Sequence, residues 1–109
     1  MPVLATIELN VDDIDALIAA KKELMDPVAD QLFPNHGHRC QIVARTDDGV
    51  LLLNLWDDEE GRDRANADAR MVAARNAVLE RTGAQATYTS YPVLAVSTTR
   101  TSGGRASRR

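Results

Sequence analysis

The sequence has little cysteine, few aromatic residues and no long hydrophobic run. Cys40 is the only cysteine in 109 residues, which excludes an internal disulfide and any multi-cysteine zinc or iron–sulfur site. Runs of apolar residues such as Gly49 to Leu53 are far shorter than the roughly 20 residues of a membrane-spanning helix. We therefore expect a protein that packs around an ordinary core and has no membrane partner.

Basic charge is scarce in the body of the chain. Residues 1–99 hold 9 bases against 16 acids, whereas the last ten residues carry four arginines and no acid. An acidic body is a poor partner for a phosphate backbone, so nucleic acid is not the expected ligand. The polar segment 100–109 is rich in glycine and serine and has no apolar anchor. It is predicted to be a disordered basic tail.

Familiar motifs of catalysis and targeting are also missing. The chain has no GxxxxGK, no GxGxxG after a strand, no GxSxG and no HExxH. The sequence therefore gives no motif-based evidence for a nucleotide-dependent enzyme or a zinc hydrolase. The first ten residues lack the basic start and the small-residue cleavage site of a secretory signal, so we expect a cytoplasmic protein.

The first part of the chain predicts a strand and a helix. Residues 3–10 alternate between apolar and polar side chains, as a strand with one buried face does. Two aspartates then cap a helix that is expected to end near Gln31, with a kink or a second piece at Pro27. Residues 33–38 contain turn-forming residues and are predicted to form a loop.

The second part predicts a hairpin, a broken helix and a last strand. Residues 39–46 and 50–56 are strand-like and joined through Asp47, Asp48 and Gly49, a short Asp-Gly connection that tolerates a positive φ. The helix that follows is expected to break at Asp68 and to end at Gly83. Its second piece is expected to bury Met71, Val72, Ala74, Val78 and Leu79. The last strand lies within residues 86–97, where Pro92 indicates a bulge or an edge.

The order β-α-β-β-α-β predicts an α+β protein with the ferredoxin-like split arrangement. Such a chain forms a four-stranded antiparallel sheet with two helices on one face. A length of 109 residues fits one domain, which we assign to residues 1–99.

The strand VLLLNLW predicts a homodimer. It offers Leu52 and Trp56 to one face of the sheet, and Leu51, Leu53 and Leu55 to the other. Since the helices cover only one face, a second subunit is expected to cover the other by two-fold packing. The alternative is a monomer whose second face is tolerated or covered by the tail.

Three segments carry a resemblance to a known superfamily. They are the step WDDEEG from a strand into a helix, the broken helix at ANADARMVAA and the closing strand YPVLAV. Over residues 3–97 the chain resembles the dimeric α+β barrel superfamily, especially its antibiotic-biosynthesis-monooxygenase-like branch. The resemblance implies two sheets packed face to face and a pocket between the sheet and the helices of each subunit. It also implies oxygenation of aromatic substrates without a metal or organic cofactor.

Asn54 and Trp56 are the leading candidates for the site. They share a parity, and an amide beside an indole is suited to orient and stack against a planar aromatic molecule. The resemblance implies that Trp56 is a stacking wall and that Asn54 stabilises an anionic substrate that meets dioxygen. The alternative is structural, with Trp56 in the core and Asn54 bonded to a neighbouring side chain.

His36 and His38 lie in the loop before the second strand and are candidates for the general base. Imidazole titrates near neutral pH and is suited to take a phenolic proton. The alternatives are two exposed loop histidines or, from the H-x-H spacing, a metal site. We predict no metal site, because no acidic or cysteine ligands cluster nearby in the sequence. Cys40 shares a parity with His38 and is expected to be buried.

Asn10, Arg75 and Tyr91 complete the expected substrate site. Asn10 belongs to a polar set on alternate strand positions whose members line either a cavity or the dimer barrel. The other members of this set are Glu8, Gln41 and Arg45. Tyr88 and Tyr91 have opposite parity, so only one of them faces a given pocket. In haem-degrading relatives of the resembled superfamily an iron-ligating histidine lies near the position of Arg75. A guanidinium cannot ligate iron, so Arg75 either pairs with a substrate oxygen or carboxylate or forms a surface salt bridge.

The sequence thus predicts a homodimer that binds a small apolar, aromatic or polyketide-like molecule. We expect it to oxygenate this molecule, or to rearrange it, without a cofactor. The alternative is a ligand-binding or stress-related dimer without turnover. A cavity of about 300 Å³ or more with converging polar groups favours the enzyme, and a filled core favours the alternative.

Overall fold

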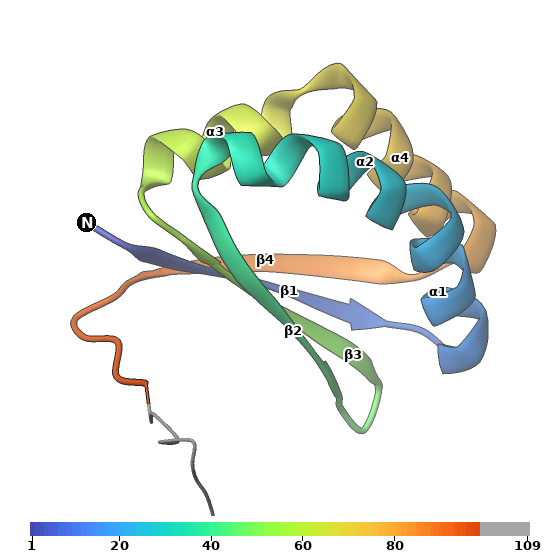
Figure 1. The fold of residues 1–109 in the computed structure, drawn as a ribbon. Coiled ribbons are helices and arrows are strands. Elements are labelled where there is room, and N and C mark those ends of the chain that lie inside the picture. The colour runs from blue at the N-terminus through green and yellow to red at the C-terminus, as the bar shows by residue number, and fades with distance from the viewer. Residues whose placement is uncertain (99–109) are drawn as a thin grey trace, which may run out of the picture.

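The computed structural model describes residues 1–98, in which helices lie over one face of a single sheet (Figure 1). The strands are β1 (Val3–Asn10), β2 (His38–Arg45), β3 (Gly49–Trp56) and β4 (Gln85–Pro92). The helical elements are α1 (Ile14–Ala20), the π-helical segment η1 (Lys21–Met25), α2 (Asp26–Leu32), the 3-10 helix η2 (Phe33–His36), α3 (Glu59–Ala67) and α4 (Ala69–Thr82). The predicted order of strands and helices is confirmed.

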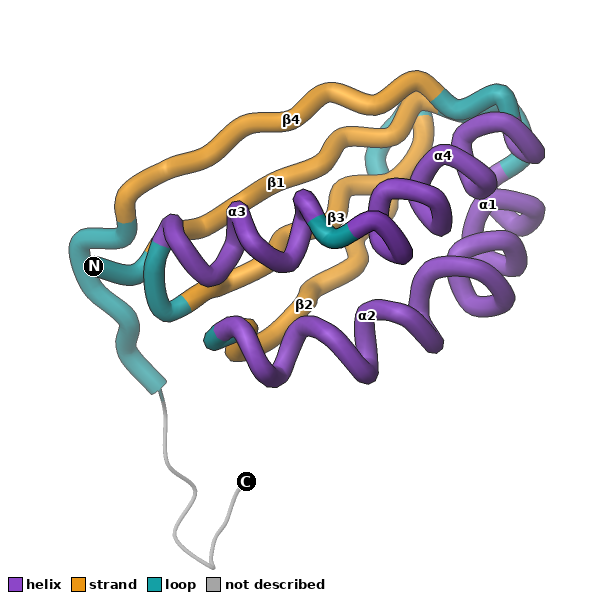
Figure 2. The backbone as a smooth tube through the Cα atoms, turned by 90° about the horizontal axis from the view of Figure 1, so that it is seen from above, coloured by secondary structure: helices purple, strands orange, loops and turns teal. Residues whose placement is uncertain are grey.

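The four strands form an antiparallel sheet in the order β2-β3-β1-β4. Figure 2 shows the helices together on one side of the strands, with β4 and β2 at the two edges. This is the ferredoxin-like arrangement that the sequence predicts. The edge position of β4 also explains Pro92, because an edge strand has backbone positions that need no hydrogen-bond donor.

The first helical stretch runs without interruption from Ile14 to Leu32. Asp13 caps it, since its carboxylate accepts a hydrogen bond from the Ala16 N–H at 3.0 Å. Pro27 lies in the first turn of α2, where a missing N–H costs little, and the turn before it is π-helical. The predicted loop after this stretch contains η2 and ends at Gly37, which has a φ of 80°.

The second helical stretch breaks at Asp68, as predicted. Gly83 ends α4 with a φ of 70°, which also agrees with the prediction. Met71, Ala74 and Val78 are buried, whereas Val72 is 36% exposed, so its predicted burial is wrong. Val72 follows Met71 by one residue and therefore lies about 100° further around the helix.

Gly49 has a role different from the one predicted. The hairpin of β2 and β3 is confirmed, but within residues 1–98 the glycines with positive φ are Gly37 and Gly83. A Cβ atom on Gly49 would lie 1.9 Å from the carbonyl oxygen of Leu9 on β1. Glycine is therefore required there by the close approach of β1 and not by a left-handed backbone.

The regular structure ends earlier than the sequence suggests. The last strand stops at Pro92, and residues 93–98 have no regular structure. The predicted basic tail at 100–109 lies outside the described residues. None of the helices within residues 1–98 is long and apolar enough to span a bilayer.

The core lies between the helices and the face of the sheet that they cover. Its largest fully buried side chains come from two strands and two helices. They are Val3, Leu17, Leu52, Trp56, Met71 and Val78. Complete burial of side chains of this size stabilises the fold by about 1.5–3 kcal/mol each. The alternating burial of β3 follows from its period of two residues.

No helix of residues 1–98 covers the opposite face of the sheet (Figure 1). Strand register places a broad apolar surface there, which we call the open face. It comprises Leu4, Thr6, Cys40, Ile42, Ala44, Leu51, Leu53, Leu55, Thr87, Thr89 and Tyr91, with Glu8 and Asn10 at one end. Ile42 and Tyr91 are 55% and 51% exposed, and Cys40 is exposed rather than buried.

We predict that Gly49→Ala destabilises the protein more than Gly83→Ala does. The first substitution pushes a methyl group into the β1 backbone and should cost about 2 kcal/mol or more. The second meets no atom within 4 Å and adds only left-handed strain of about 1 kcal/mol. Urea unfolding followed by Trp56 fluorescence measures both. Equal losses of stability would show that close approach at Gly49 is not the constraint.

Candidate functional site

A cavity of about 230 Å³ lies between the helices and the middle of the sheet. Its apolar lining residues are Ala5, Ile7, Met25, Phe33, Leu52, Trp56, Met71 and Tyr88. Its polar lining residues are Gln41, Asn54, Arg62, Asn66, Arg75 and Ser90. Thr6 and Thr89 also border it, although strand register turns their side chains to the open face. No aspartate or glutamate is among these residues. The cavity is smaller than the 300 Å³ set as a criterion above, although its polar groups do converge.

The cavity exists because small residues follow one another across the sheet. Asn54 on β3 pairs with Ala5 on β1, and Ala5 pairs with Ser90 on β4. The next large neighbours in the same strands are Trp56 and Tyr88, so space remains between them. Above this row the helices break at Asp68, and the residues on either side of the break line the roof.

Asn54 is buried, with 5% of its surface exposed, and its amide oxygen is fully occupied. Oδ1 lies 2.9 Å from His38 Nε2 and 3.0 Å from Gln41 Nε2, both on β2. A carbonyl oxygen only accepts hydrogen bonds, so Gln41 is a donor, and a hydrogen bond from His38 requires the tautomer that carries its proton on Nε2. These two bonds leave the amide nitrogen of Asn54 for the cavity.

A β-bulge places His38 beside Asn54. His38 pairs with Trp56, Cys40 with Leu55 and Gln41 with Asn54, so Arg39 is the extra residue. The predicted shared parity of His38 and Cys40 is therefore wrong. Without the bulge, positions 38 and 41 would lie on opposite faces of the sheet.

Three rings pack at the end of the cavity nearest to β2. The rings of Phe33, His38 and Trp56 have centroids 4.8–5.0 Å apart in tilted or edge-to-face contacts. Trp56 is 1% exposed, and its Nε1 has no hydrogen-bond partner in the described part of the chain. The cluster holds the imidazole in place from two sides and makes the indole a rigid wall.

Two guanidinium groups reach the cavity from the second helical stretch. Arg62 on α3 bonds to Asp63 and to the hydroxyl of Ser90. Arg75 on α4 donates from one Nη to the backbone carbonyl of Asn66 at 3.2 Å. Within residues 1–98 no carboxylate oxygen lies within 4.0 Å of Arg75. Among the described residues no carboxylate therefore neutralises Arg75, and its charge is available to a bound anion.

The structure brings together Asn54, Trp56 and Arg75 from the predicted site. His38 touches Asn54 and Trp56 but does not line the cavity itself. His36 lies in η2, outside the cavity, where its carbonyl approaches Gly61 closely.

Asn10 and Tyr91 do not join this group. Strand parity places both on the open face, whereas Tyr88 points to the helix side and lines the cavity. The polar set of the first two strands divides in the same way. Gln41 faces the cavity, and Glu8 is on the open face with Asn10.

Sequence reasoning missed Arg62, Asn66 and Ser90 as lining residues. Nothing in the local sequence distinguishes Arg62 from an exposed helical arginine. Ser90 has the same parity as Tyr88, which the register of β4 turns toward the helices. Within residues 1–98 no group of three or more His, Cys, Asp or Glu side chains is arranged to hold a metal ion.

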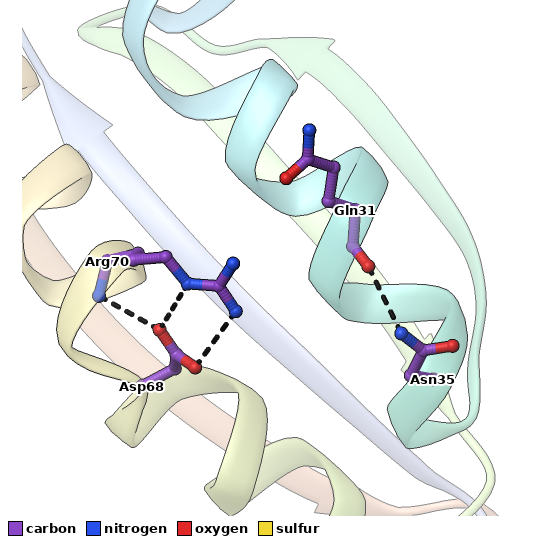
Figure 3. Close-up of polar contacts among 4 residues, drawn as sticks. All are labelled: Gln31, Asn35, Asp68 and Arg70. Atoms are coloured by element: carbon purple, nitrogen blue, oxygen red, sulfur yellow. Dashed lines mark hydrogen bonds and ion pairs between the residues drawn. The ribbon is translucent and has the colours of Figure 1, made fainter.

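The helix break above the cavity is held by an ion pair. Asp68 accepts from the backbone N–H of Arg70 at 2.9 Å and from its guanidinium at 3.2 and 3.3 Å (Figure 3). The side-chain hydrogen bond from Arg70 is the main reason why the pKa of Asp68 lies below its ordinary 3.8. Figure 3 also shows Asn35 bonding back to the carbonyl of Gln31 at 3.2 Å, which closes the end of the first helical stretch.

Comparison with known proteins bears on the fold. No family model and no curated protein matches the sequence. Rv0793 from Mycobacterium tuberculosis has a TM-score of 0.67 at 18% identity, with 90% of this chain and 100% of that chain covered. SnoaB, a cofactor-independent oxygenase from Streptomyces nogalater, has a TM-score of 0.66 at 14% identity, with 87% and 95% covered. A dimeric ferredoxin-like protein from an uncultured marine organism has a TM-score of 0.70 at 8% identity, with 91% and 100% covered.

This chain has the α+β ferredoxin-like fold. The resemblance to the dimeric α+β barrel superfamily and its antibiotic-biosynthesis-monooxygenase-like branch is thereby confirmed at the level of the fold. Identities of 8–18% carry the architecture and leave the chemistry to be argued from the cavity.

We predict that Asp68→Asn lowers stability at neutral pH and that the difference from wild type shrinks in acid. Because the folded state lowers the pKa of Asp68, the carboxylate stabilises the fold fully above the ordinary value. This contribution is lost as the pH falls through the lower folded-state value. Urea unfolding at a series of pH values measures the difference, with the exposed Asp30→Asn on α2 as the control. A difference that is independent of pH would contradict the role of the charge.

Proposed function

We propose that this protein is a homodimeric enzyme that oxygenates a small aromatic molecule with dioxygen and without a metal or organic cofactor. The observation that carries the proposal is the cavity itself. It joins an apolar lining to the amide of Asn54, the guanidinium of Arg75 and the indole of Trp56. The same combination suits a flat ligand that carries one or more oxygen atoms.

The size of the cavity limits the ligand. Pockets for drug-sized molecules occupy about 300–1,000 Å³, and this cavity is about 230 Å³. The preferred ligand therefore has one or two rings rather than an extended polycyclic skeleton. Trp56 on β3 forms one wall of the cavity, and Tyr88 on β4 also lines it. Both are therefore placed to contact the faces or edges of such a ring.

The charges of the cavity favour a substrate anion. Among residues 1–98, two arginines and no carboxylate line it, so a bound phenol or activated C–H acid loses its proton more easily than in water. No histidine lines the cavity, and Nε2 of His38 is already engaged with Asn54. We therefore propose that water at the mouth of the cavity accepts the proton of the substrate. Asn54 and Arg75 then stabilise the substrate anion that remains.

The proposed reaction balances with dioxygen as the only oxidant. An activated CH₂ carbon loses one proton, and the carbanion gives its electron pair to dioxygen to form a C–O bond. The peroxide anion takes up a proton to become a hydroperoxide. Loss of the remaining C–H proton and cleavage of the O–O bond then give a carbonyl group and one molecule of water. The substrate carbon is oxidised, and dioxygen is reduced.

The open face supports the homodimer. Leu51, Leu53 and Leu55 of β3 and Ile42 of β2 form a continuous apolar surface on it. An uncovered sheet face of this kind is stabilised by a second sheet, and two-fold packing is the common solution. Structural neighbours from an uncultured marine organism and from Bacteroides fragilis are dimeric proteins with a ferredoxin-like fold.

A ligand-binding dimer without turnover is the second candidate. Two features favour it: the cavity is smaller than expected for an enzyme pocket, and no titratable base lines it apart from Tyr88. In this case Arg75 and Asn54 hold the ligand in the same way, but dioxygen consumption is absent.

We predict dioxygen uptake by the pure, metal-stripped protein with one- and two-ring quinols and naphthols, such as 1-naphthol, whose keto tautomer carries an activated CH₂ carbon. Asn54→Ala and Arg75→Leu should lower the rate about tenfold or more, because each removes a group that stabilises the anion. Trp56→Phe should lower it less. Arg64→Leu, which changes an exposed arginine on α3, is the matched control and should leave the rate unchanged. Uptake no faster than in buffer for every substrate would rule out the oxygenase and leave the ligand-binding dimer.

We predict that Leu53→Asp divides the dimer. The substitution puts a charge in the middle of the open face, where burial against a second sheet is costly. Ala73→Asp on the exposed side of α4 is the control. Sedimentation should show a species of twice 11.9 kDa for wild type and control, and the single chain for Leu53→Asp. A wild-type monomer at micromolar concentration would contradict the homodimer.

A further inference from the structure

The hydrogen bonds of Asn54 decide which atom of its amide group faces the cavity. Both bonds to this side chain end on Oδ1, from His38 at 2.9 Å and from Gln41 at 3.0 Å. An amide has its acceptor on one side and its two donors on the other. As long as two donors face Oδ1, the group that Asn54 offers to the cavity is N–H.

The local backbone is shaped to bring these two donors onto one oxygen. The bulge at Arg39 puts His38 and Gln41, three residues apart, on the same face of β2. The extra residue is tied down outside the cavity, where Arg39 Nε bonds to Asp57. The Asp57 N–H in turn donates to the Gly37 carbonyl at 2.8 Å. Bulges commonly re-aim a side chain beside a functional site.

Reversal of the amide requires two coordinated changes. If Asn54 turned over, its Nδ2 would face the N–H groups of both neighbours. Gln41 would then have to turn its own amide, and His38 would have to move its proton from Nε2 to Nδ1. The rings of Phe33 and Trp56 hold the imidazole in place during any such change. A substitution at position 41 that offers only an acceptor is therefore expected to reverse the Asn54 amide and, with it, the hydrogen bond to His38.

We propose that His38 and Gln41 are positioning residues that lock Asn54 as a hydrogen-bond donor, so that the cavity selects ligands whose polar atom is an acceptor. A carbonyl, ether or phenolate oxygen, or a ring nitrogen with a lone pair, satisfies the Asn54 N–H groups. A ligand of similar shape whose polar group is an N–H that only donates meets donors and is rejected. This inference deepens the proposed function and rests on the cavity being a ligand site, but it does not depend on turnover.

The first test reads the proton on His38 and needs no ligand. The chain contains two histidines, so nitrogen-15 NMR with a His36→Gln variant assigns the rings. At slightly alkaline pH, wild-type His38 should be the Nε2–H tautomer. In Gln41→Glu the new carboxylate accepts from Asn54, the amide turns, and His38 should change to the Nδ1–H tautomer. A wild-type Nδ1–H tautomer, or an unchanged tautomer in folded Gln41→Glu, would overturn the proposal.

The second test reads ligand preference with two uncharged probes of similar size. The ring nitrogen of quinoline only accepts a hydrogen bond, and that of indole only donates one. Calorimetric titration should show that wild type prefers quinoline and that Gln41→Glu shifts the ratio of the two dissociation constants about tenfold or more toward indole. Gln85→Glu on β4 adds the same charge outside the cavity and should leave the ratio unchanged. An equal ratio in wild type and Gln41→Glu would contradict donor locking.

A pair of His38 variants separates positioning from simple packing. His38→Gln keeps an N–H donor near the place of Nε2, whereas His38→Leu fills the space without one. The quinoline preference should survive in His38→Gln and decline in His38→Leu, and loss in both would overturn the role of the donor. Absence of dioxygen uptake together with the predicted tautomers would reject the oxygenase alone and leave this inference standing.

Discussion

The structure depends on the fact that β3 is apolar on both sides. A central strand with leucines on one face and Leu52 and Trp56 on the other needs two covers. The helices supply the first cover and bury Trp56 and Leu52 almost completely. The open face carries the other leucines.

Asn54 is the exception in this strand, and the candidate site is built around it. A buried amide is costly unless its hydrogen bonds are made, and two side chains from β2 satisfy its oxygen. Its nitrogen is satisfied only by what enters the cavity. Ala5 and Ser90, which follow Asn54 across the sheet, are too small to fill the space in front of it. The cavity is therefore the consequence of one polar residue in an apolar row with small neighbours.

The sequence was sufficient for the topology because local signals decide it. The caps at Asp13 and Asp68, the hairpin and the final edge strand at Pro92 each follow from residue types with one preferred conformation. Asn54, Trp56 and Arg75, which the sequence analysis selected, line the same cavity. Strand parity pointed to the first two, and the family resemblance pointed to Arg75. These features require no knowledge of how the strands are registered.

The remaining parts of the site depend on register, which residue types do not encode. One bulge residue, Arg39, reverses the expected relation of His38 to Cys40, because parity holds only for regular strands. The choice between Tyr88 and Tyr91 depends on the pairing of β4 with β1, which places Tyr88 opposite Ile7 and Tyr91 opposite Leu4. Gly49 looked like a turn glycine, whereas the nearby Leu9 carbonyl, far away in sequence, is the reason for it.

The distribution of charge connects the fold to the proposed chemistry. Residues 1–99 carry 16 acids against 9 bases, yet in the described part of the chain the cavity is lined by Arg62 and Arg75 and by no acid. Several of the acids are exposed, such as the run from Asp57 to Glu60 at the start of α3. At physiological ionic strength such surface charges are screened over about 8 Å, whereas a charge inside an apolar cavity acts at contact distance and in a lower dielectric. In the proposed function, the acidic surface thus slows the approach of an anionic substrate only slightly. Inside the cavity, the electric field that acts on this anion comes from Arg75 and from the N–H groups of Asn54.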